Sequence, residues 1–499
     1  MRRAPLLATA LTVVISAGAC TTTGTGTATP ARDQALMAIP INTQSAVARD
    51  EFLLGLRDLD VEKNTSARAH FARALAADPG YALGHLYAAF AAPSVGTYRN
   101  HLDEAIRLAD RASPVEQLWI RAEQRGLDND VNGQLDISRQ LVAATPSDPR
   151  ALGYLAGVQF NAGRPSDARA TLERALQVAP NFAPVFIQLG NSYLNVEPSD
   201  PTKGAIYIRQ AVALEPNEPY THDYMGDAYR AQNNLPAARA EYSRMIELDP
   251  TRAGAYQQRG HVNSFLGNFA EARADYDRAV VLADPIDKPG LGLYRAIVHV
   301  YEGDPAAAEA ELDQQLVTID GMNIPNAVGA KIGVLNEEAL IALHNRHFDV
   351  AQRSIDRLRD LYRQQSEMGR SDAFRRGNEA NIAYWEGMLA ARRGDFATTR
   401  SKAGDIMRLL APDQSPRKNE PAHELLGWAD LLEGHNTSAA NHFAQANPNN
   451  IYVAYHRGLA LEAAGRPAEA QVFFKRVAGW NFNGSSTALV KKEAAKKVT

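Results

Sequence analysis

The sequence predicts an all-α fold in which about twelve helix–turn–helix units stack into a right-handed superhelical solenoid. Three observations predict it. A skeleton of a small residue, Ala, an aromatic residue or Leu, a second small residue and Pro recurs along the chain with a period of 34 residues. One copy of the skeleton runs from Gly55 to Pro79, and another runs from Gly226 to Pro250. Apolar residues follow helical spacing within each unit. Asp or Asn beside Pro closes many of the units.

Each unit is expected to hold two antiparallel helices joined by a short turn. In the unit that begins at Ala253, Val262 and Phe265 are apolar positions of the first helix, residues 266–268 form the turn, and residues 271–282 form the second helix. The twelve predicted units begin near Ala48, Ala82, Val115, Pro149, Ala183, Pro219, Ala253, Pro289, Ile332, Ala380, Glu420 and Ile451.

This pattern resembles the tetratricopeptide repeat family over about residues 48–480. In that family a small residue at the eighth position of the first helix lets the second helix approach, and an Ala of the second helix packs into the gap. The matching small residues are Gly55, Gly190, Gly226, Gly260, Gly387, Gly427 and Gly458, and the matching alanines are Ala67, Ala238, Ala272, Ala439 and Ala470. The resemblance implies a protein that binds other proteins.

The spacing divides the chain into five segments. Residues 1–19 are a predicted signal peptide, and residues 20–47 are a lipidated N-terminus with a Thr/Gly/Pro-rich flexible tether. Residues 48–285 form a regular solenoid. The spacing loosens over residues 286–480, where segments rich in breakers or charge lengthen the connections. Residues 481–499 are expected to be a polar, frayed C-terminal tail.

The N-terminus predicts a membrane-anchored protein of the bacterial cell envelope. Arg2 and Arg3 precede a short apolar stretch, and small residues then lead to Cys20, the single cysteine of the chain. This arrangement resembles a bacterial lipoprotein signal, which makes Cys20 the expected site of lipidation. Thr21 after the cysteine resembles the signal for an outer-membrane lipoprotein that faces the periplasm. The alternative is a cysteine that lies by chance beside an ordinary signal-peptidase site.

Composition narrows the function. The 499 residues carry a net charge of −4, so there is no overall basic field to hold nucleic acid, and we predict no nucleic-acid partner. One cysteine excludes an intramolecular disulfide framework.

Motifs for catalysis or metal binding are weak. His423-Glu424 begins like the zinc-protease motif H-E-x-x-H, but Gly427 stands where the second histidine should be. His344 and His347 lie three positions apart without a visible third ligand. No nucleophile elbow or phosphate-binding loop is present in the sequence. We therefore predict no enzyme, no catalytic residue, no metal site and no cofactor.

A solenoid of this kind offers a concave groove lined by the first helix of each pair. Positions two, five, nine and twelve of that helix are expected to face the groove. Asn191 resembles the groove asparagine that binds a ligand's backbone in many family members. The predicted partner-binding residues are Asn191, Tyr220, Asp223, Asp227, Arg230, Gln257 and His261.

The sequence thus predicts a non-enzymatic envelope lipoprotein that acts as a scaffold. It would bind a segment of an unidentified protein or peptide partner in its groove while the lipid anchor holds it at the membrane. Two alternatives stay open. One is a binder of glycans or small molecules that uses an aromatic groove near the C-terminus, formed by Tyr384, Trp428, Tyr452 and Tyr455. The other is an enzyme whose site lies in the irregular half, near Arg370, Arg375 and Arg376.

Overall fold

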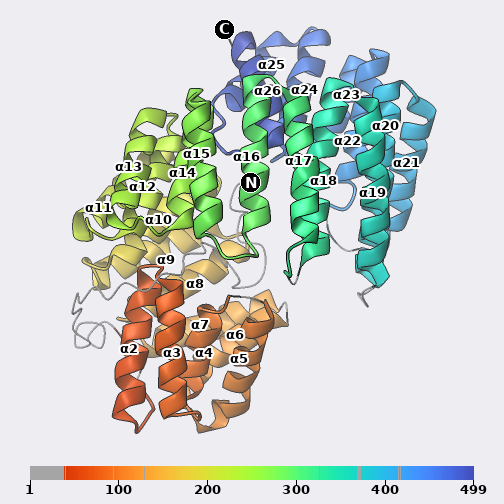
Figure 1. Ribbon diagram of the computed structural model, residues 1–499. Helices are drawn as coiled ribbons and strands as arrows, with labels where there is room; N and C mark the ends of the chain where they lie inside the picture. Colours follow the sequence, from red (N-terminus) through yellow and green to blue (C-terminus); the bar gives the residue numbers. More distant parts are fainter. Residues whose placement is uncertain are drawn as a thin grey trace. The chain divides into compact units, whose positions relative to one another are not determined.

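The fold is known from a computed structural model that describes residues 37, 39, 41–93, 95–128, 130–324, 326–367, 372–413, 415 and 417–498. Over these residues the regular structure is entirely helical, and no strand is found (Figure 1). The chain divides into two compact units, Met1–Ala255 and Tyr256–Thr499, which are described separately.

Unit 1 contains consecutive helices that pack as antiparallel pairs. The pairs are α2 with α3, α4 with α5, and so on to α12 with α13. Their bounds are α2 Ala46–Asp60, α3 Asn64–Ala77, α4 Ala82–Phe90, α5 Val95–Leu108, the short 3₁₀ helix η1 Ala109–Arg111, α6 Pro114–Leu127, α7 Val131–Ala144, α8 Pro149–Asn161, α9 Pro165–Val178, α10 Ala183–Asn195, α11 Pro201–Leu214, α12 Pro219–Ala231 and α13 Leu235–Leu248.

Helix α14 (Ala253–Leu266) begins at the end of unit 1 and continues into unit 2. Unit 2 follows the same paired arrangement from α16 with α17 to α24 with α25. The bounds are α15 Phe269–Leu282, α16 Lys288–Glu302, α17 Pro305–Asp320, α18 Ala327–Asn345, α19 Phe348–Glu367, α20 Asp372–Arg393, α21 Phe396–Leu409, α22 Glu420–Glu433, α23 Asn436–Gln445, α24 Ile451–Ala463, α25 Pro467–Ala478 and α26 Ser485–Lys497.

The small residues of the repeat sit where two paired helices come closest. A Cβ atom added to Gly226 would lie 2.4 Å from Tyr242 Cε1, and one added to Gly427 would lie 2.7 Å from Phe443. Glycine therefore makes room for the aromatic ring of the second helix. The repeat alanines are fully buried beside these contacts: Ala67, Ala238, Ala272, Ala439 and Ala470. This packing confirms the predicted pairing of helices.

Polar residues and prolines set the ends of many helices. Pro149 is the first residue of α8, where the missing N–H costs no hydrogen bond, and Asp148 before it accepts hydrogen bonds from the backbone of Arg150 and Ala151. Gly434 ends α22 with a φ of 85°, a left-handed conformation that glycine adopts without strain.

The looser repeat spacing of the second half has a structural cause. Helices α18, α19 and α20 contain 19, 20 and 22 residues, whereas most helices of unit 1 contain 13 to 15. The charged residues near 364–379, which are expected to lengthen a connection, instead extend the end of α19 and the start of α20. By packing, the chain divides after Ala255. The predicted boundary near residue 285 marks a change in repeat spacing and stays a prediction.

The predicted C-terminal tail differs from the structure. Residues Ser485–Lys497 form helix α26, in which Val490 and Ala494 are fully buried. Alanine, lysine and leucine favour a helix. The small apolar face is too narrow to be recognised as a repeat helix from its sequence, yet it is wide enough to pack against other helices.

Candidate binding surfaces

The predicted groove residues of unit 1 are more buried than side chains that face solvent in an open groove. Tyr220, Asp223 and Arg230 of α12 are 1%, 6% and 4% exposed. Asn191 of α10 and Asp227 of α12 are half-buried. Asp227 accepts a hydrogen bond from the Tyr242 hydroxyl at 2.7 Å. These contacts belong to the fold, and binding of a partner by the five residues stays a prediction.

The turn between α2 and α3 covers part of this surface. Val61 is 1% exposed and packs in a cluster with Tyr220 and Tyr224 of α12. The Tyr224 hydroxyl donates a hydrogen bond to Glu62 at 2.7 Å. At the start of α12, the Tyr220 hydroxyl donates to Glu215 at 2.8 Å. The first repeat therefore contacts α12, more than 150 residues later in the sequence.

Ion pairs fasten the end of α2 to the same region. Arg57 pairs with Glu215 at 3.1 Å, and Lys63 pairs with Glu218 at 2.9 Å. The Asp60 carboxylate accepts hydrogen bonds from Arg150, from Nη2 at 2.5 Å and from Nε at 3.3 Å. Burial raises the pKa of Asp60, while the Arg150 guanidinium acts in the opposite direction. A buried pair of this kind fixes the register of the two elements, because losing either partner leaves a charge without compensation.

The other two predicted groove residues, Gln257 and His261, lie on α14 within unit 2. Gln257 is half-buried, and its amide nitrogen lies 3.3 Å from His261 Nε2. His261 is 6% exposed, and its Nδ1 lies 2.8 Å from the Tyr276 hydroxyl and 3.0 Å from the amide nitrogen of Asn483. The segment before α26 therefore already contacts this part of the predicted surface.

The four aromatic residues of the predicted C-terminal groove do not form an exposed patch. Trp428 and Tyr452 are each 1% exposed, Tyr455 is 8% exposed and Tyr384 is half-buried. The sequence leaves open whether these residues are core or exposed, and the structure buries three of them. Arg392 explains part of the burial, because its guanidinium lies 3.8 Å from the centre of the Trp428 ring and donates to the Tyr452 hydroxyl at 2.7 Å.

Buried polar groups line this aromatic cluster. The Tyr384 hydroxyl donates to Glu424 at 3.0 Å, and burial raises the pKa of Glu424 to about 7. His344 Nδ1 lies 2.8 Å from the Tyr452 hydroxyl, and burial together with the Arg392 charge lowers the pKa of His344 to about 4. His344 is therefore neutral at pH 7. Its contacts give it a place in the packing of α18 against α24.

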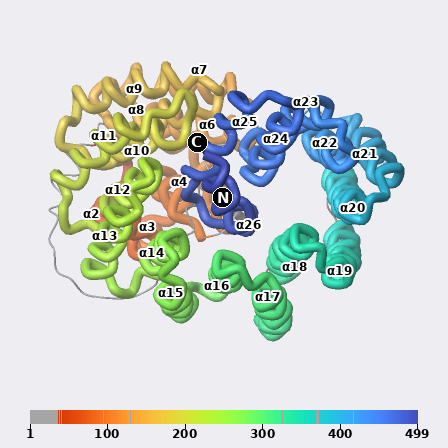
Figure 2. The backbone as a smooth tube through the Cα atoms, turned by 90° about the horizontal axis from the view of Figure 1, so that it is seen from above, coloured from red at the N-terminus to blue at the C-terminus, as the bar shows by residue number. Residues whose placement is uncertain are grey.

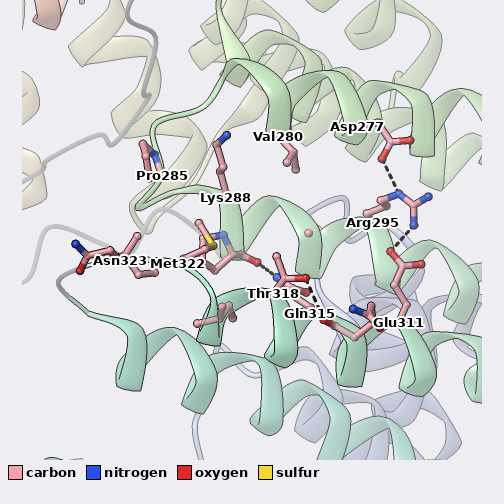
Figure 3. A pocket seen from close by; sticks show the side chains of 15 residues that line it. Asp277, Val280, Pro285, Lys288, Arg295, Glu311, Gln315, Thr318, Met322 and Asn323 are labelled. Carbon is pink, nitrogen blue, oxygen red and sulfur yellow. Dashed lines mark hydrogen bonds and ion pairs between the residues drawn. The ribbon is translucent and has the colours of Figure 1, made fainter.

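A pocket of about 680 Å³ opens between α15, α16 and α17 of unit 2 (Figure 3). Its lining is mainly apolar and includes Val280, Pro289, Ile319, Met322 and Ile324. The sequence analysis did not identify this pocket. Pro285, Pro289, Gly290 and Gly292 near the start of α16 were the available signal, because prolines and glycines at a helix start are an irregularity of the repeat.

Polar groups surround the pocket at two places. At one, Arg295 donates to Asp277 at 2.7 Å and to Glu311 at 2.5 Å, as Figure 3 shows. At the other, the Gln315 amide donates to the carbonyl of Pro289, and its Oε1 is buried without a hydrogen bond in the described part of the chain. Gly292 permits this arrangement, since a Cβ there would lie 2.8 Å from Gln315 Nε2. The pocket thus offers a mainly apolar surface, beside which the Gln315 amide is held by Pro289.

The chemical motifs of the sequence have structural roles. Gly427 packs against Phe443, as the repeat requires, and His423 Nδ1 lies 3.1 Å from His442 Nδ1. His347 pairs with Glu309 at 2.8 Å, whereas His344 faces Tyr452, so the two histidines have different partners.

The remaining titratable groups of interest are carboxylates with cationic partners. Arg376 pairs with Asp413 at 2.7 Å and Arg375 pairs with Asp372, whereas Arg370 lies outside the described residues. Within the described ranges, Asp430, Glu433 and His435 form one group whose ligand atoms lie close enough for a metal ion. Arg400 already pairs with both carboxylates of this group.

Cys20, the signal peptide and most of the tether lie outside the described residues. Among the helices that the structure describes, none has the length and apolar character needed to cross a membrane.

Family comparisons agree with the repeat pattern. Residues 226–264 match a family described as TPR repeat, and residues 132–184 and 253–283 match families described as tetratricopeptide repeat. A relative from Xanthomonas axonopodis pv. citri (strain 306), cellulose synthase operon protein C, is 30% identical over 195 residues. The match covers 36% of this chain and only 13% of the length of that relative.

Solved structures also resemble parts of the chain. A chain of the APC/C hetero-tetramer Cut9-Hcn1 is 15% identical, with a TM-score of 0.40 over 91% of this chain and 78% of the other. YrrB, a TPR protein with an unusual peptide-binding site, is 19% identical, with a TM-score of 0.27 over 36% of this chain and 91% of the other. The family matches show that residues 132–184 and 226–283 contain TPR repeats, and the paired helices with their glycine–aromatic contacts continue the same helical architecture along the described chain.

Proposed function

We propose that this protein is a non-enzymatic scaffold of the bacterial cell envelope that binds a segment of a partner protein on the first helices of its repeats. The observation that carries the proposal is the TPR repeat itself, because each repeat presents a first helix that a partner segment can contact. Asn191 and Gln257 supply amide groups on first helices. Asn191 accepts a hydrogen bond from Asn195, and the Gln257 amide nitrogen lies 3.3 Å from His261 Nε2, so each amide contacts a side chain of its own helix.

The membrane attachment is part of the proposal and rests on the sequence. Acylation at Cys20 would add several lipid chains, and two or more chains hold a protein stably at a bilayer, whereas one chain does not. A Thr/Gly/Pro-rich tether after Cys20 would let the repeats stand away from the surface. We place the protein at the outer membrane, facing the periplasm.

The relative from a cellulose synthase operon favours an envelope machine as the setting. Because the match covers 13% of that protein, it supports the use of the repeats as a scaffold more than any particular pathway. Secretion, pilus assembly and polysaccharide export are all settings in which such a scaffold would hold partners at the membrane.

The test is a pull-down from solubilised native membranes with identification by mass spectrometry. The wild-type chain is compared with a double variant, Asn191→Ala with Gln257→Ala, and with the control Gln140→Ala, an exposed amide on the second helix of its pair. The proposal expects a partner that is recovered with the wild type and the control and reduced at least tenfold with the double variant. Equal recovery with all three chains would move the partner away from the first helices.

The pocket between α15 and α17 favours a second candidate, the binding of a small apolar ligand. Its volume of about 680 Å³ lies within the range of ligand pockets, and its lining is mainly apolar. The exposed residue Thr318 lines the pocket, so Thr318→Trp should fill it. A ligand that raises the melting temperature of the wild type and not of this variant would establish the site, and a panel without such a ligand would count against it.

A further inference from the structure

We propose that helix α26 is a displaceable ligand of unit 2, held in cis on the face where the helix of a partner protein docks. This inference deepens the proposed function and rests on it, since it names the surface and the kind of partner segment.

Helix α26 lies against the first helices of three different pairs. It contacts α16, α18 and α24, and also α25, which it follows in the chain. Figure 2 shows the helices from α16 to α25 following an arc, with α26 on its inner side. A helix that merely capped the last repeat would pack against α24 and α25. Contact with α16 and α18 places α26 across the face that first helices present to a partner.

The segment before α26 is anchored by one buried asparagine. Asn483 is 5% exposed, its amide nitrogen donates to the Tyr276 hydroxyl at 2.9 Å, and its Oδ1 accepts from the Tyr301 hydroxyl at 2.8 Å. The same nitrogen lies 3.0 Å from His261 Nδ1. These three partners come from α14, α15 and α16, about 180 to 220 residues earlier. His261, Tyr276 and Tyr301 thus surround the amide group of Asn483 and form what we call the Asn483 cradle. A TPR surface would bind the amide group of a separate chain in the same way.

The helix itself buries few large apolar groups. Leu489 and Val490 are the only large aliphatic residues among its buried positions, and the rest are Ser485, Thr487, Ala488 and Ala494. By contrast α24, of the same length, buries Ile451, Tyr452, Val453, Tyr455 and Leu461 among others. Since burial of large apolar side chains supplies most of the stability of a packed helix, α26 is held less firmly than the repeat helices around it.

The other contacts of α26 are polar, and some reach the repeat helices: Lys497 pairs with Glu462 of α24 at 2.5 Å, and Gln471 of α25 donates to the Lys497 carbonyl at 2.7 Å. Lys491 Nζ donates to the carbonyls of Ala478 and Trp480 and to Asn481 Oδ1, at 2.6 to 2.8 Å. These acceptors belong to the end of α25 and the connecting segment, so the Lys491 contacts fold the segment upon itself. The contacts with Trp480 and Asn481 would travel with α26 if it left, whereas the contact with Ala478 of α25 would break. On its outer side, Lys492, Glu493 and Lys496 are exposed.

The kind of partner follows from this chemistry. It is a protein with a short helix that has a narrow face of alanine, leucine and valine and is preceded by an extended segment with an asparagine. Such a segment would take the Asn483 cradle and the groove between α16, α18 and α24. Displacement of α26 would then couple binding to the release of the C-terminus.

The experiment uses the full chain with a protease recognition site inserted after the exposed residue Gly479, so that the protein folds before it is cut. The probe is a fluorescein-labelled peptide of residues 480–499. We expect that the uncut chain does not raise the anisotropy of the probe, because α26 occupies the face. The cut chain should exchange its own segment for the probe. A peptide with Asn483→Ala should bind at least tenfold more weakly, and the control peptide with Lys492→Ala should bind like the original.

Three outcomes would overturn the inference: a cut chain that does not exchange its segment, a cut chain that loses its cooperative unfolding transition when the segment is removed, or equal binding of the Asn483→Ala peptide. The first two would make α26 a permanent part of the fold. Dimers formed by the cut or uncut chain would assign the face to a second copy of this chain. Because only the purified chain and its own peptide are used, failure here leaves the membrane pull-down unaffected, and failure of the pull-down leaves this result unaffected.

Discussion

Gly226 shows how a single residue fixes the spacing of a helix pair. A Cβ at this position would lie 2.4 Å from Tyr242 Cε1. The Tyr242 ring is fully buried, and its hydroxyl donates a hydrogen bond to Asp227. We expect Gly226→Ala to lower the free energy of unfolding by about 1–3 kcal/mol, because the ring cannot move without breaking that contact. Urea denaturation measures it.

The matched control is Gly157→Ala in α8, where nothing lies within 4 Å of the added Cβ. Alanine is the better helix former, so this variant should gain up to about 1 kcal/mol. If both variants shifted stability in the same direction, the glycine–aromatic contact would not be what sets the helix spacing.

Glu123 gives a prediction about pH. Burial raises its pKa from 4.5 to about 7, while the Tyr98 hydroxyl donates to it at 2.8 Å. The folded state therefore binds this proton more tightly than the unfolded state, and the wild type loses stability as the pH rises from about 4.5 to about 7. Glu123→Gln removes this loss. The variant should be more stable than the wild type at pH 8, by on the order of 1–3 kcal/mol, and the difference should shrink toward pH 5.

Chemical denaturation at pH 5 and pH 8 measures the difference, with the exposed Glu379→Gln as the control. A pH-independent difference for Glu123→Gln would show that the carboxylate is charged in the folded protein throughout this range.

At the scale of the element, the turn between α2 and α3 holds the first repeat against α12. Val61→Ala removes two buried methyl groups from the contact with Tyr220 and Tyr224, and we expect a loss of about 1–3 kcal/mol. Hydrogen exchange should also quicken in α2 and α3 more than in α8 and α9.

Val47→Ala in α2, the helix that precedes Val61, is the control, because Val47 is 60% exposed. Its effect should stay within about 0.5 kcal/mol. Equal effects of the two valine variants would mean that the turn does not pack on α12 in solution.

Much of the fold follows from the sequence at this scale. The period of 34 residues and the small residues such as Gly226 and Gly427 identify paired helices, and those contacts depend on residues close in sequence. The contacts of Val61 and Asn483 could not be found this way, because they join positions more than 150 residues apart. The same limit explains the aromatic residues. Helical spacing places Trp428 on a first helix, but only the packed structure shows Arg392 covering its ring.

At the scale of the whole molecule, the proposed membrane attachment depends on one residue, Cys20. Cys20→Ala should move the protein from the membrane fraction to the soluble fraction, and the circular dichroism spectrum and melting temperature of the mature domain should stay unchanged. Fractionation followed by immunoblotting measures the distribution. A variant that stayed in the membrane fraction would show that attachment does not depend on acylation of Cys20.

The central claim is that the first helices of the repeats bind a partner protein. Site-specific photocross-linking in native cells tests it most directly, with the photoreactive residue placed in turn at Asn191, at Gln257 and at the control position Gln140. The account predicts that one protein cross-links from the first two positions and not from Gln140. No cross-linked protein at Asn191 and Gln257, or the same protein from all three positions, would contradict it.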